Sequence, residues 1–252
     1  TGPVRMVQLW RNGAAGANSL RQCDTGNASC PYQMVVKVTT QASLGVAHSV
    51  SDPLVTLRTG DQNQTQALDC DPATSNLKSE IVSGCAPSYT KNTGIACPDS
   101  KTTLWASPQP WNCVALSTGT QTNQVSSGLN QRILGNSQAT TCTNPNRYAS
   151  EFVNGWDRTD PRIVKLLLVP FGSFTGTGSG TVPVIDFATF YITGWEGQGN
   201  GFSNPCAATD DPASGKGNIV GHFISYTDLG GTPSSSDCDP NSLTPCIGVL
   251  TR

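Results

Sequence analysis

Charged side chains are scarce in this sequence of 252 residues. Asp, Glu, Lys and Arg make up 13% of it, against about 25% in an average soluble protein. The 15 basic and 17 acidic residues leave a formal net charge of −2, so the chain has no basic field that would attract phosphate groups. Nucleic acid is therefore not an expected partner, and much of the polar surface has to come from Ser, Thr, Asn and Gln.

Long apolar runs are also missing. The most apolar stretch, from Ile163 to Phe171, contains Lys165 and Pro170 and is far shorter than the ~20 apolar residues of a membrane-spanning helix. We therefore expect the chain as given to be soluble. It begins at Thr1 without a basic and apolar leader, so we expect any export signal or N-terminal membrane anchor to have been removed or to lie outside this sequence.

Histidine and metal-binding motifs are rare as well. The chain has two histidines, His48 and His222, and no Cys-x-x-Cys sequence, which excludes the spacing of zinc fingers and of thioredoxin-like redox sites. It does have ten cysteines, an even number spread along the whole chain and typical of a protein oxidised outside the cytoplasm. They are Cys23, Cys30, Cys70, Cys85, Cys97, Cys113, Cys142, Cys206, Cys238 and Cys246.

These cysteines predict five disulfide bonds. Spacing alone does not determine connectivity, but short separations favour local bonds at both ends of the chain and two loop-closing bonds in the middle, which leaves one longer pair. The pairs expected in this way are Cys23–Cys30, Cys70–Cys85, Cys97–Cys113, Cys142–Cys206 and Cys238–Cys246.

Turn residues and β-branched runs dominate the rest of the pattern. The 26 glycines and 17 prolines indicate many turns, and runs rich in Val, Ile, Phe and Tyr between them predict strands. The segments are 4–10, 32–39, 44–58 with a break at Asp52-Pro53, 162–171, 182–195, 218–226 and 245–251. We expect a mainly β, disulfide-stapled antiparallel β-sandwich or barrel-like domain with one short helix and long loops.

One helix is predicted, over residues 122–134. Val125, Leu129 and Ile133 recur every four residues, and Gly135 follows where a left-handed turn would end the helix. Thr122 or Asn123 can cap its start. The whole chain is expected to form one exported β-rich domain, with a subdivision into a cysteine-rich, loop-rich half (1–120) and a β-sheet half (121–252) as the alternative.

His222 and Asp186 are the residues that a catalytic interpretation would use. His222 lies in a predicted strand and Asp186 in an apolar one, and with a serine they would make a secreted hydrolase of Ser/His/Asp type. No Gly-x-Ser-x-Gly elbow is present, and the nearest sequence, Gly178-Ser179-Gly180, falls in a loop between strands. We therefore favour structural roles for both residues, assign no catalytic residue, and keep the hydrolase as an alternative.

Two further binding hypotheses have weak support. Asp210 and Asp211 precede a turn and are weak candidates for calcium, but they lack the ligand ladder of a calcium loop, so no metal or cofactor is assigned. A carbohydrate-binding module is the other alternative, because exposed tryptophan rings stack on sugars. The four candidates are dispersed, however, and Trp more often packs in a core; they are Trp105, Trp111, Trp156 and Trp195.

The second half of the chain carries several short blocks that resemble a known family. The blocks are DPRIV (160–164), PFGSF (170–174), VPV (182–184), FATFY (187–191) with Trp195, GKG (215–217) and VGHF (220–223). Together with the stretch from Cys113 to Cys142, they are similar to actinobacterial TadE/TadG-like proteins, which are associated with assembly of Flp (tight adherence) pili. The resemblance implies an envelope protein with one N-terminal membrane helix that exposes this domain outside the cell. It implies no catalytic residue.

On this basis we expect an extracellular or cell-surface, non-catalytic domain. It would act in Flp pilus assembly or surface adhesion through contacts with envelope or pilus proteins. The segments 172–181 and 196–217 are rich in Gly and polar residues, which is typical of exposed loops. They are therefore the candidate contact surface.

Overall fold

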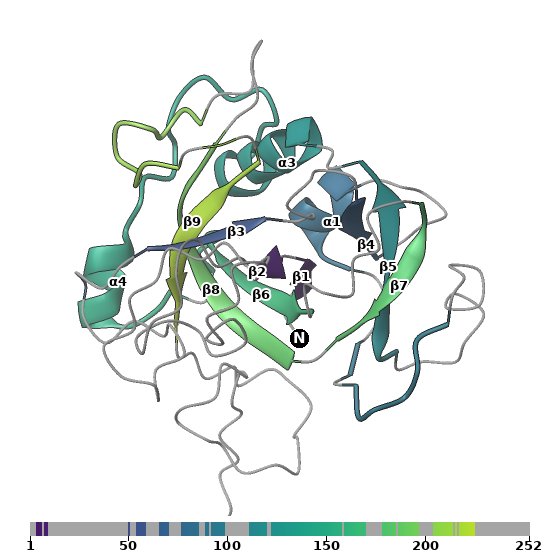
Figure 1. Ribbon diagram of the computed structural model, residues 1–252. Coiled ribbons are helices and arrows are strands. Elements are labelled where there is room, and N and C mark those ends of the chain that lie inside the picture. The colour runs from purple at the N-terminus through teal and green to yellow at the C-terminus, as the bar shows by residue number, and fades with distance from the viewer. Residues whose placement is uncertain are drawn as a thin grey trace, which may run out of the picture.

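Two β-sheets and three helices make up the described part of the computed structural model (Figure 1). The structure describes residues 4–6, 8–9, 50, 54–58, 66–70, 77–85, 89–90, 92–98, 111–119, 122–157, 159–169, 178–184, 186–196, 204–213, 215 and 217–224. The predicted strands 32–39 and 245–251 lie outside these residues. Among the described residues, no helix is long and apolar enough to cross a membrane.

The larger sheet has six strands. In spatial order they are β1 (Val4–Met6), β6 (Ile163–Leu168), β8 (Asp186–Trp195), β9 (Ile219–Phe223), β3 (Val55–Arg58) and β2 (Gln8–Leu9). Every ladder is antiparallel except the parallel pair of β1 and β6. One residue separates β1 from β2 in the chain, although these strands are the two edges, so the sheet curves strongly. The described strand pairings form no closed barrel, and they do not show a β-sandwich.

The smaller sheet has three antiparallel strands, β4 (Gln66–Asp69), β5 (Cys113–Thr118) and β7 (Gly180–Pro183). The single strand predicted over 182–195 is therefore two strands, β7 and β8, in different sheets. Pro183 is the last residue of β7. Because proline has no N–H to donate to a ladder, it is tolerated in an edge strand, and β7 is an edge of this sheet.

The helices are α1 (Leu77–Ser83), α3 (Thr122–Leu134) and α4 (Tyr148–Asn154). Helix α3 has the predicted bounds, and Val125, Leu129 and Ile133 are all buried. The expectation of a single helix is wrong, since the structure also contains α1 and α4. Each of these has only 7 residues, which is too few for a hydrophobic period to be recognised in the sequence. A Cβ atom at Gly128 would lie 3.1 Å from Ile81, so this glycine lets α3 approach α1 closely.

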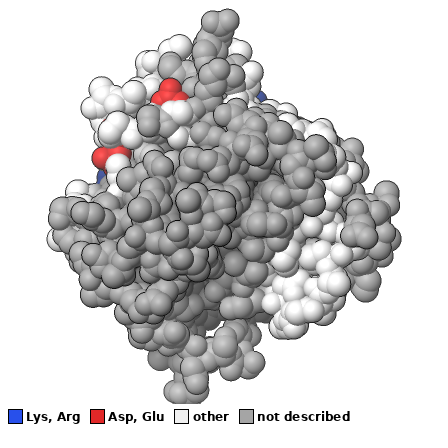
Figure 2. All heavy atoms as spheres, in the orientation of Figure 1, with Lys and Arg blue, Asp and Glu red and all other residues white. Residues whose placement is uncertain are grey.

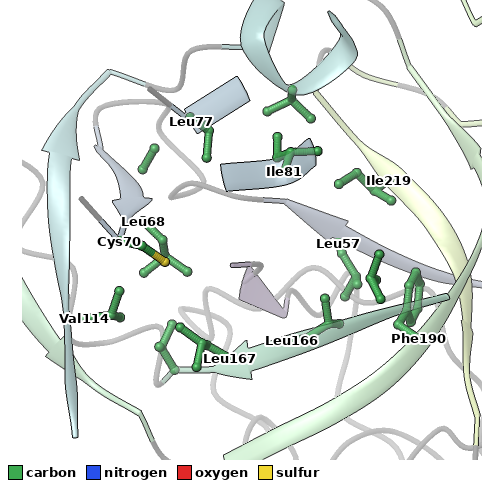
Figure 3. Packing of buried hydrophobic residues seen from close by; sticks show 14 of the residues in the cluster. Leu57, Leu68, Cys70, Leu77, Ile81, Val114, Leu166, Leu167, Phe190 and Ile219 are labelled. Carbon is green, nitrogen blue, oxygen red and sulfur yellow. The ribbon is translucent and has the colours of Figure 1, made fainter. Parts of the chain in front are cut away.

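One buried apolar cluster joins both sheets and the pair α1 and α3 (Figure 3). Leu57, Leu166 and Phe190 come from the larger sheet, while Leu68 and Val114 come from the smaller one. Strands from the two sides of position 120, the boundary of the alternative subdivision, form ladders with each other. Strand β3 pairs with β9, and β5 pairs with β7. On the face drawn in Figure 2, few of the described side chains are charged.

Three of the predicted disulfide bonds are confirmed: Cys70–Cys85, Cys97–Cys113 and Cys142–Cys206. Their Cα atoms are 5.4, 5.7 and 4.8 Å apart, within the range that a disulfide requires. The other two predicted pairs, Cys23–Cys30 and Cys238–Cys246, lie outside the described residues. The three confirmed bonds are compatible with an extracellular protein.

Candidate functional site

A fully buried arginine, Arg162, organises the junction between β6, β8 and the segment 204–213. It is 0% exposed, so each of its N–H groups needs a partner inside the protein. Its Nε and Nη2 donate to the Asn144 carbonyl oxygen at 3.2 and 2.8 Å, and its Nη1 donates to the Ile192 carbonyl oxygen at 3.0 Å. Nη2 also forms an ion pair with Asp210 Oδ1 at 3.0 Å.

The partner carboxylate, Asp210, is equally buried at its side chain. Burial raises the pKa of Asp210, while the positive charge of Arg162 and a hydrogen bond from Asn204 oppose that rise. The Asn204 Nδ2 group donates to Asp210 Oδ2 at 2.8 Å. Both oxygens of the carboxylate are thus occupied by groups of the same chain.

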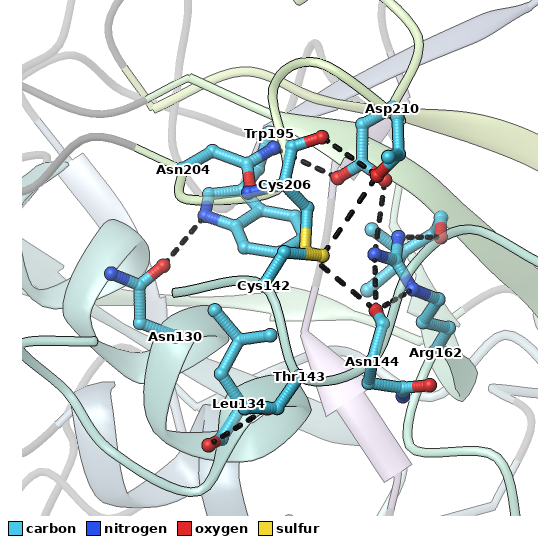
Figure 4. The surroundings of a disulfide bond; sticks show 12 residues. Asn130, Leu134, Cys142, Thr143, Asn144, Arg162, Trp195, Asn204, Cys206 and Asp210 are labelled. Atoms are coloured by element: carbon cyan, nitrogen blue, oxygen red, sulfur yellow. Dashed lines mark hydrogen bonds and ion pairs between the residues drawn. A yellow bond between two sulfur atoms is a disulfide. The ribbon is translucent and has the colours of Figure 1, made fainter. Parts of the chain in front are cut away.

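The disulfide Cys142–Cys206 lies beside this ion pair (Figure 4). Cys206 is in the same short segment as Asn204 and Asp210, and its backbone N–H donates to Asn204 Oδ1 at 2.8 Å. The Arg162 guanidinium also lies 5.5 Å from the ring centre of Trp195, within reach of a cation–π contact. The Trp195 Nε1–H in turn donates to Asn130 Oδ1 on α3 at 3.0 Å.

The segment 204–213 is held in place at several points but presents an exposed top. Its Asp211 backbone N–H donates to the Thr193 carbonyl oxygen of β8 at 3.0 Å. A Cβ atom at Gly194 would overlap the Asp211 carbonyl oxygen, so only glycine lets the segment lie this close to β8. Ala207, Ala208 and Thr209 are exposed. We call residues 204–213 the anchored loop.

A second polar cluster lies between α4 and β8. The Nη2 atom of Arg147 lies 3.3 Å from Glu151 Oε1, 3.5 Å from Asp157 Oδ2 and 3.1 Å from Asp160 Oδ2. The Tyr191 hydroxyl donates to Asp160 Oδ2 at 2.9 Å and accepts a hydrogen bond from the Arg147 backbone N–H at 3.2 Å. We call these five residues the Arg147 cluster.

Two members of the Arg147 cluster have shifted pKa values. Burial, aided by a hydrogen bond with Asp160 and by the negative charge of Asp160, raises the pKa of Glu151 to about 7. Burial, aided by the charges of Asp160 and Glu151, also raises the pKa of Tyr191. The tyrosine therefore keeps its proton and acts as a donor to Asp160 at physiological pH.

Aromatic rings pack next to the Arg147 cluster. Tyr148 on α4 stacks on His222 of β9, with ring centres 4.1 Å apart, and also contacts Tyr191 at 5.5 Å. Phe152 and Trp156 lie 5.7 Å from Tyr148 at their ring centres and are partly buried. These contacts attach α4 to the six-stranded sheet.

The structure does not bring together the two residues of the hydrolase alternative. His222 is 3% exposed and lies opposite Tyr191 in the ladder, whereas Asp186 begins β8 and lies opposite Leu168. The position that faces His222, Tyr191, is therefore five residues further along β8 than Asp186, a distance of about 17 Å. Ser179, in the nearest elbow-like sequence, is exposed and precedes β7, which a helix does not follow.

The residues of the calcium and carbohydrate-binding hypotheses lie in separate surroundings. Asp210 faces the cation Arg162, and no group of three or more His, Cys, Asp or Glu side chains that could hold a metal is found among the described residues. Trp111 and Trp195 are buried, while Trp156 is partly buried among other rings. Trp105 lies outside the described residues. The three described tryptophans form no shared platform.

Sequence reasoning missed most of the residues that build both clusters. No sequence pattern marks Arg162, Arg147, Glu151 or Asp160 as a site residue, and Asp210 is predicted only as a weak calcium candidate. The available signal was the pair of charges, Asp160 and Arg162, immediately before the apolar strand β6. Charged residues in such a position require buried partners if the strand is central.

Comparison with known proteins gives no match: no family model, no curated protein and no solved structure is significantly similar to the chain. The similarity to TadE/TadG-like proteins therefore stays an expectation from the sequence.

Proposed function

We propose that this chain is the exported, non-catalytic domain of a TadE/TadG-like protein, which acts at the cell surface in Flp pilus assembly or adhesion through contacts with pilus or envelope proteins. The observation that carries the proposal is the anchored loop. It belongs to the segment 196–217, which the sequence predicts to be a contact surface, and it combines firm attachment with exposure.

A loop that is already held in its bound shape loses little conformational freedom when a partner binds, so more of the contact energy appears as affinity. The disulfide Cys142–Cys206, the buried ion pair of Arg162 and Asp210, and the hydrogen bond from Asp211 to Thr193 all restrict the anchored loop. Ala207 and Ala208 are exposed and can face a partner, while the hydroxyl of the exposed Thr209 donates to the Cys206 carbonyl oxygen at 3.0 Å. Disulfides would also preserve this shape outside the cell.

The test is a bulky charge placed on the anchored loop. Ala208→Arg introduces a long cation at an exposed position, and it should lower surface piliation or adhesion in cells of the source organism without lowering the amount of folded, exported protein. Ala96→Arg is the matched control, because Ala96 is also exposed but lies in the segment 92–98 near the smaller sheet. Equal piliation and adhesion in wild type, Ala208→Arg and Ala96→Arg would contradict the proposal.

A further inference from the structure

The Arg147 cluster places three carboxylates around one guanidinium. Glu151, Asp157 and Asp160 all lie within 3.5 Å of Arg147 Nη2, so the cluster carries an excess of negative charge when all three are ionised. Asp157 is well exposed, with 41% of its side chain accessible, and water screens its charge. The Glu151 and Asp160 side chains are only 6% and 0% exposed. Repulsion between these two is therefore poorly screened.

We propose that the Arg147 cluster is a pH-operated clasp, which holds α4 against the six-stranded sheet more tightly in mildly acidic than in mildly alkaline solution. When Glu151 carries a proton, it forms a hydrogen bond with the Asp160 carboxylate, and Arg147 balances the charge that is left. When Glu151 loses this proton, two buried carboxylates face each other with one arginine between them. The contact between α4 and the turn at 157–160 then weakens.

The clasp connects three elements, so its loosening has a defined structural consequence. Asp160 accepts hydrogen bonds from Tyr191 of β8 and from the Arg162 backbone N–H, at 2.9 and 2.8 Å, and is therefore fixed to the sheet. Glu151 belongs to α4 and accepts a hydrogen bond from the Asp157 backbone N–H at 3.1 Å. Ionisation of Glu151 therefore acts on the link between helix and sheet.

Other titratable groups near Glu151 have to be separated from it in a test. Within the described part of the chain, Arg147 lies at the N-cap of α4 and Tyr148 is the first residue of the helix. The turn after α4 contributes Asp157 and Asp160, and the sheet contributes Tyr191 from β8 and His222 from β9, which reaches the region through its stack on Tyr148. Of these, His222 is the group whose ordinary pKa also falls between pH 5 and 8.

Two measurements test the clasp. The first is a carbon-13 NMR titration of the side-chain carboxyl of Glu151 in the wild-type protein, which should show its midpoint near pH 7. The second is hydrogen exchange of the α4 amides, corrected for the intrinsic pH dependence of exchange. The opening constant of α4 should rise on the order of tenfold between pH 5.5 and 8.5, because the open state would bind fewer protons than the closed one in this range.

Glu151→Gln supplies the decisive variant, since it keeps the size and hydrogen-bonding ability of the side chain but cannot ionise. In this variant the opening constant of α4 should be nearly independent of pH, whereas the control Glu196→Gln should behave like wild type. A Glu151 carboxyl that titrates near its ordinary pKa of 4.5 would overturn the proposal even if Glu151→Gln failed to fold. An unchanged pH dependence in folded Glu151→Gln would overturn it too, and would assign the effect to His222.

Discussion

Arg162 and Asp210 form an ion pair at 3.0 Å although neither side chain is exposed to solvent. The pair joins the residue immediately before β6 to the anchored loop across 48 residues of sequence, next to the disulfide Cys142–Cys206. Taking two charges out of water costs free energy, which the pair regains only because the remaining donors and acceptors are also satisfied. The position of the anchored loop therefore depends on the hydrogen-bond partners of both side chains, which are Asn144 and Ile192 for Arg162 and Asn204 for Asp210.

Replacement of Asp210 by Asn should strongly destabilise the protein. The change removes the negative charge and leaves Arg162 buried without its counter-ion, a situation that costs about 3 kcal/mol or more. Urea unfolding of Asp210→Asn and of the control Asp211→Asn measures the difference. If both variants lost the same small amount of stability, the buried pair would not hold the loop.

The disulfide Cys142–Cys206 should contribute more stability than Cys97–Cys113. It spans 64 residues, against 16 for the shorter bond, and the loop-closure estimate gives about 4 and about 3 kcal/mol. Replacing each pair by serines and comparing the free energies of unfolding tests this order. A larger loss for the Cys97–Cys113 variant would show that loop length does not dominate here.

Gly194 should not tolerate a methyl group. A Cβ atom there would overlap the Asp211 carbonyl oxygen, so Gly194→Ala has to push the anchored loop away from β8, at a cost of roughly 2 kcal/mol. Gly180→Ala is the control, because Gly180 is also in a strand but a Cβ atom added to it would meet no other atom within 4 Å. Thermal unfolding should place Gly180→Ala at or slightly above wild type. Equal behaviour of the two variants would contradict the close approach.

The unfolding free energy should decrease between pH 5 and 8. The pKa of Glu151 is about 7 in the folded protein and 4.5 as a free side chain, so the folded state binds more protons than the unfolded state in this window. Stability from this group is therefore present at low pH and lost as the pH rises to 7, by at most about 3 kcal/mol. Glu151→Gln should flatten the curve and be more stable than wild type at pH 8. A wild-type curve that rises over this range would contradict the assigned shift.

Local patterns in the sequence predicted local structure well. The spacing of Val125, Leu129 and Ile133 located α3 at its observed bounds, and short cysteine separations gave the pairs Cys70–Cys85 and Cys97–Cys113. The strand runs at 162–171 and 218–226 correspond to β6 and β9. In these cases the signal lies within about twenty residues of chain.

The site could not be predicted in the same way. Arg162 and Asp210 come together because two strands and a disulfide bring distant segments to one place. The spacing of residues in the sequence does not predict such a contact. Seven-residue helices such as α4 show too few turns for periodicity. The split of 182–195 into β7 and β8 also depends on which sheet each half joins, which only the tertiary packing decides.

Cross-linking mass spectrometry of the untagged protein in intact cells of its source tests the proposed contact role most directly, because it assumes no substrate and reports bound partners. The account predicts reproducible links from the segment 196–217, which contains the anchored loop, to pilin or to components of the pilus-secretion machinery. Recovery of the protein free in the medium, with no links to such components, would contradict it.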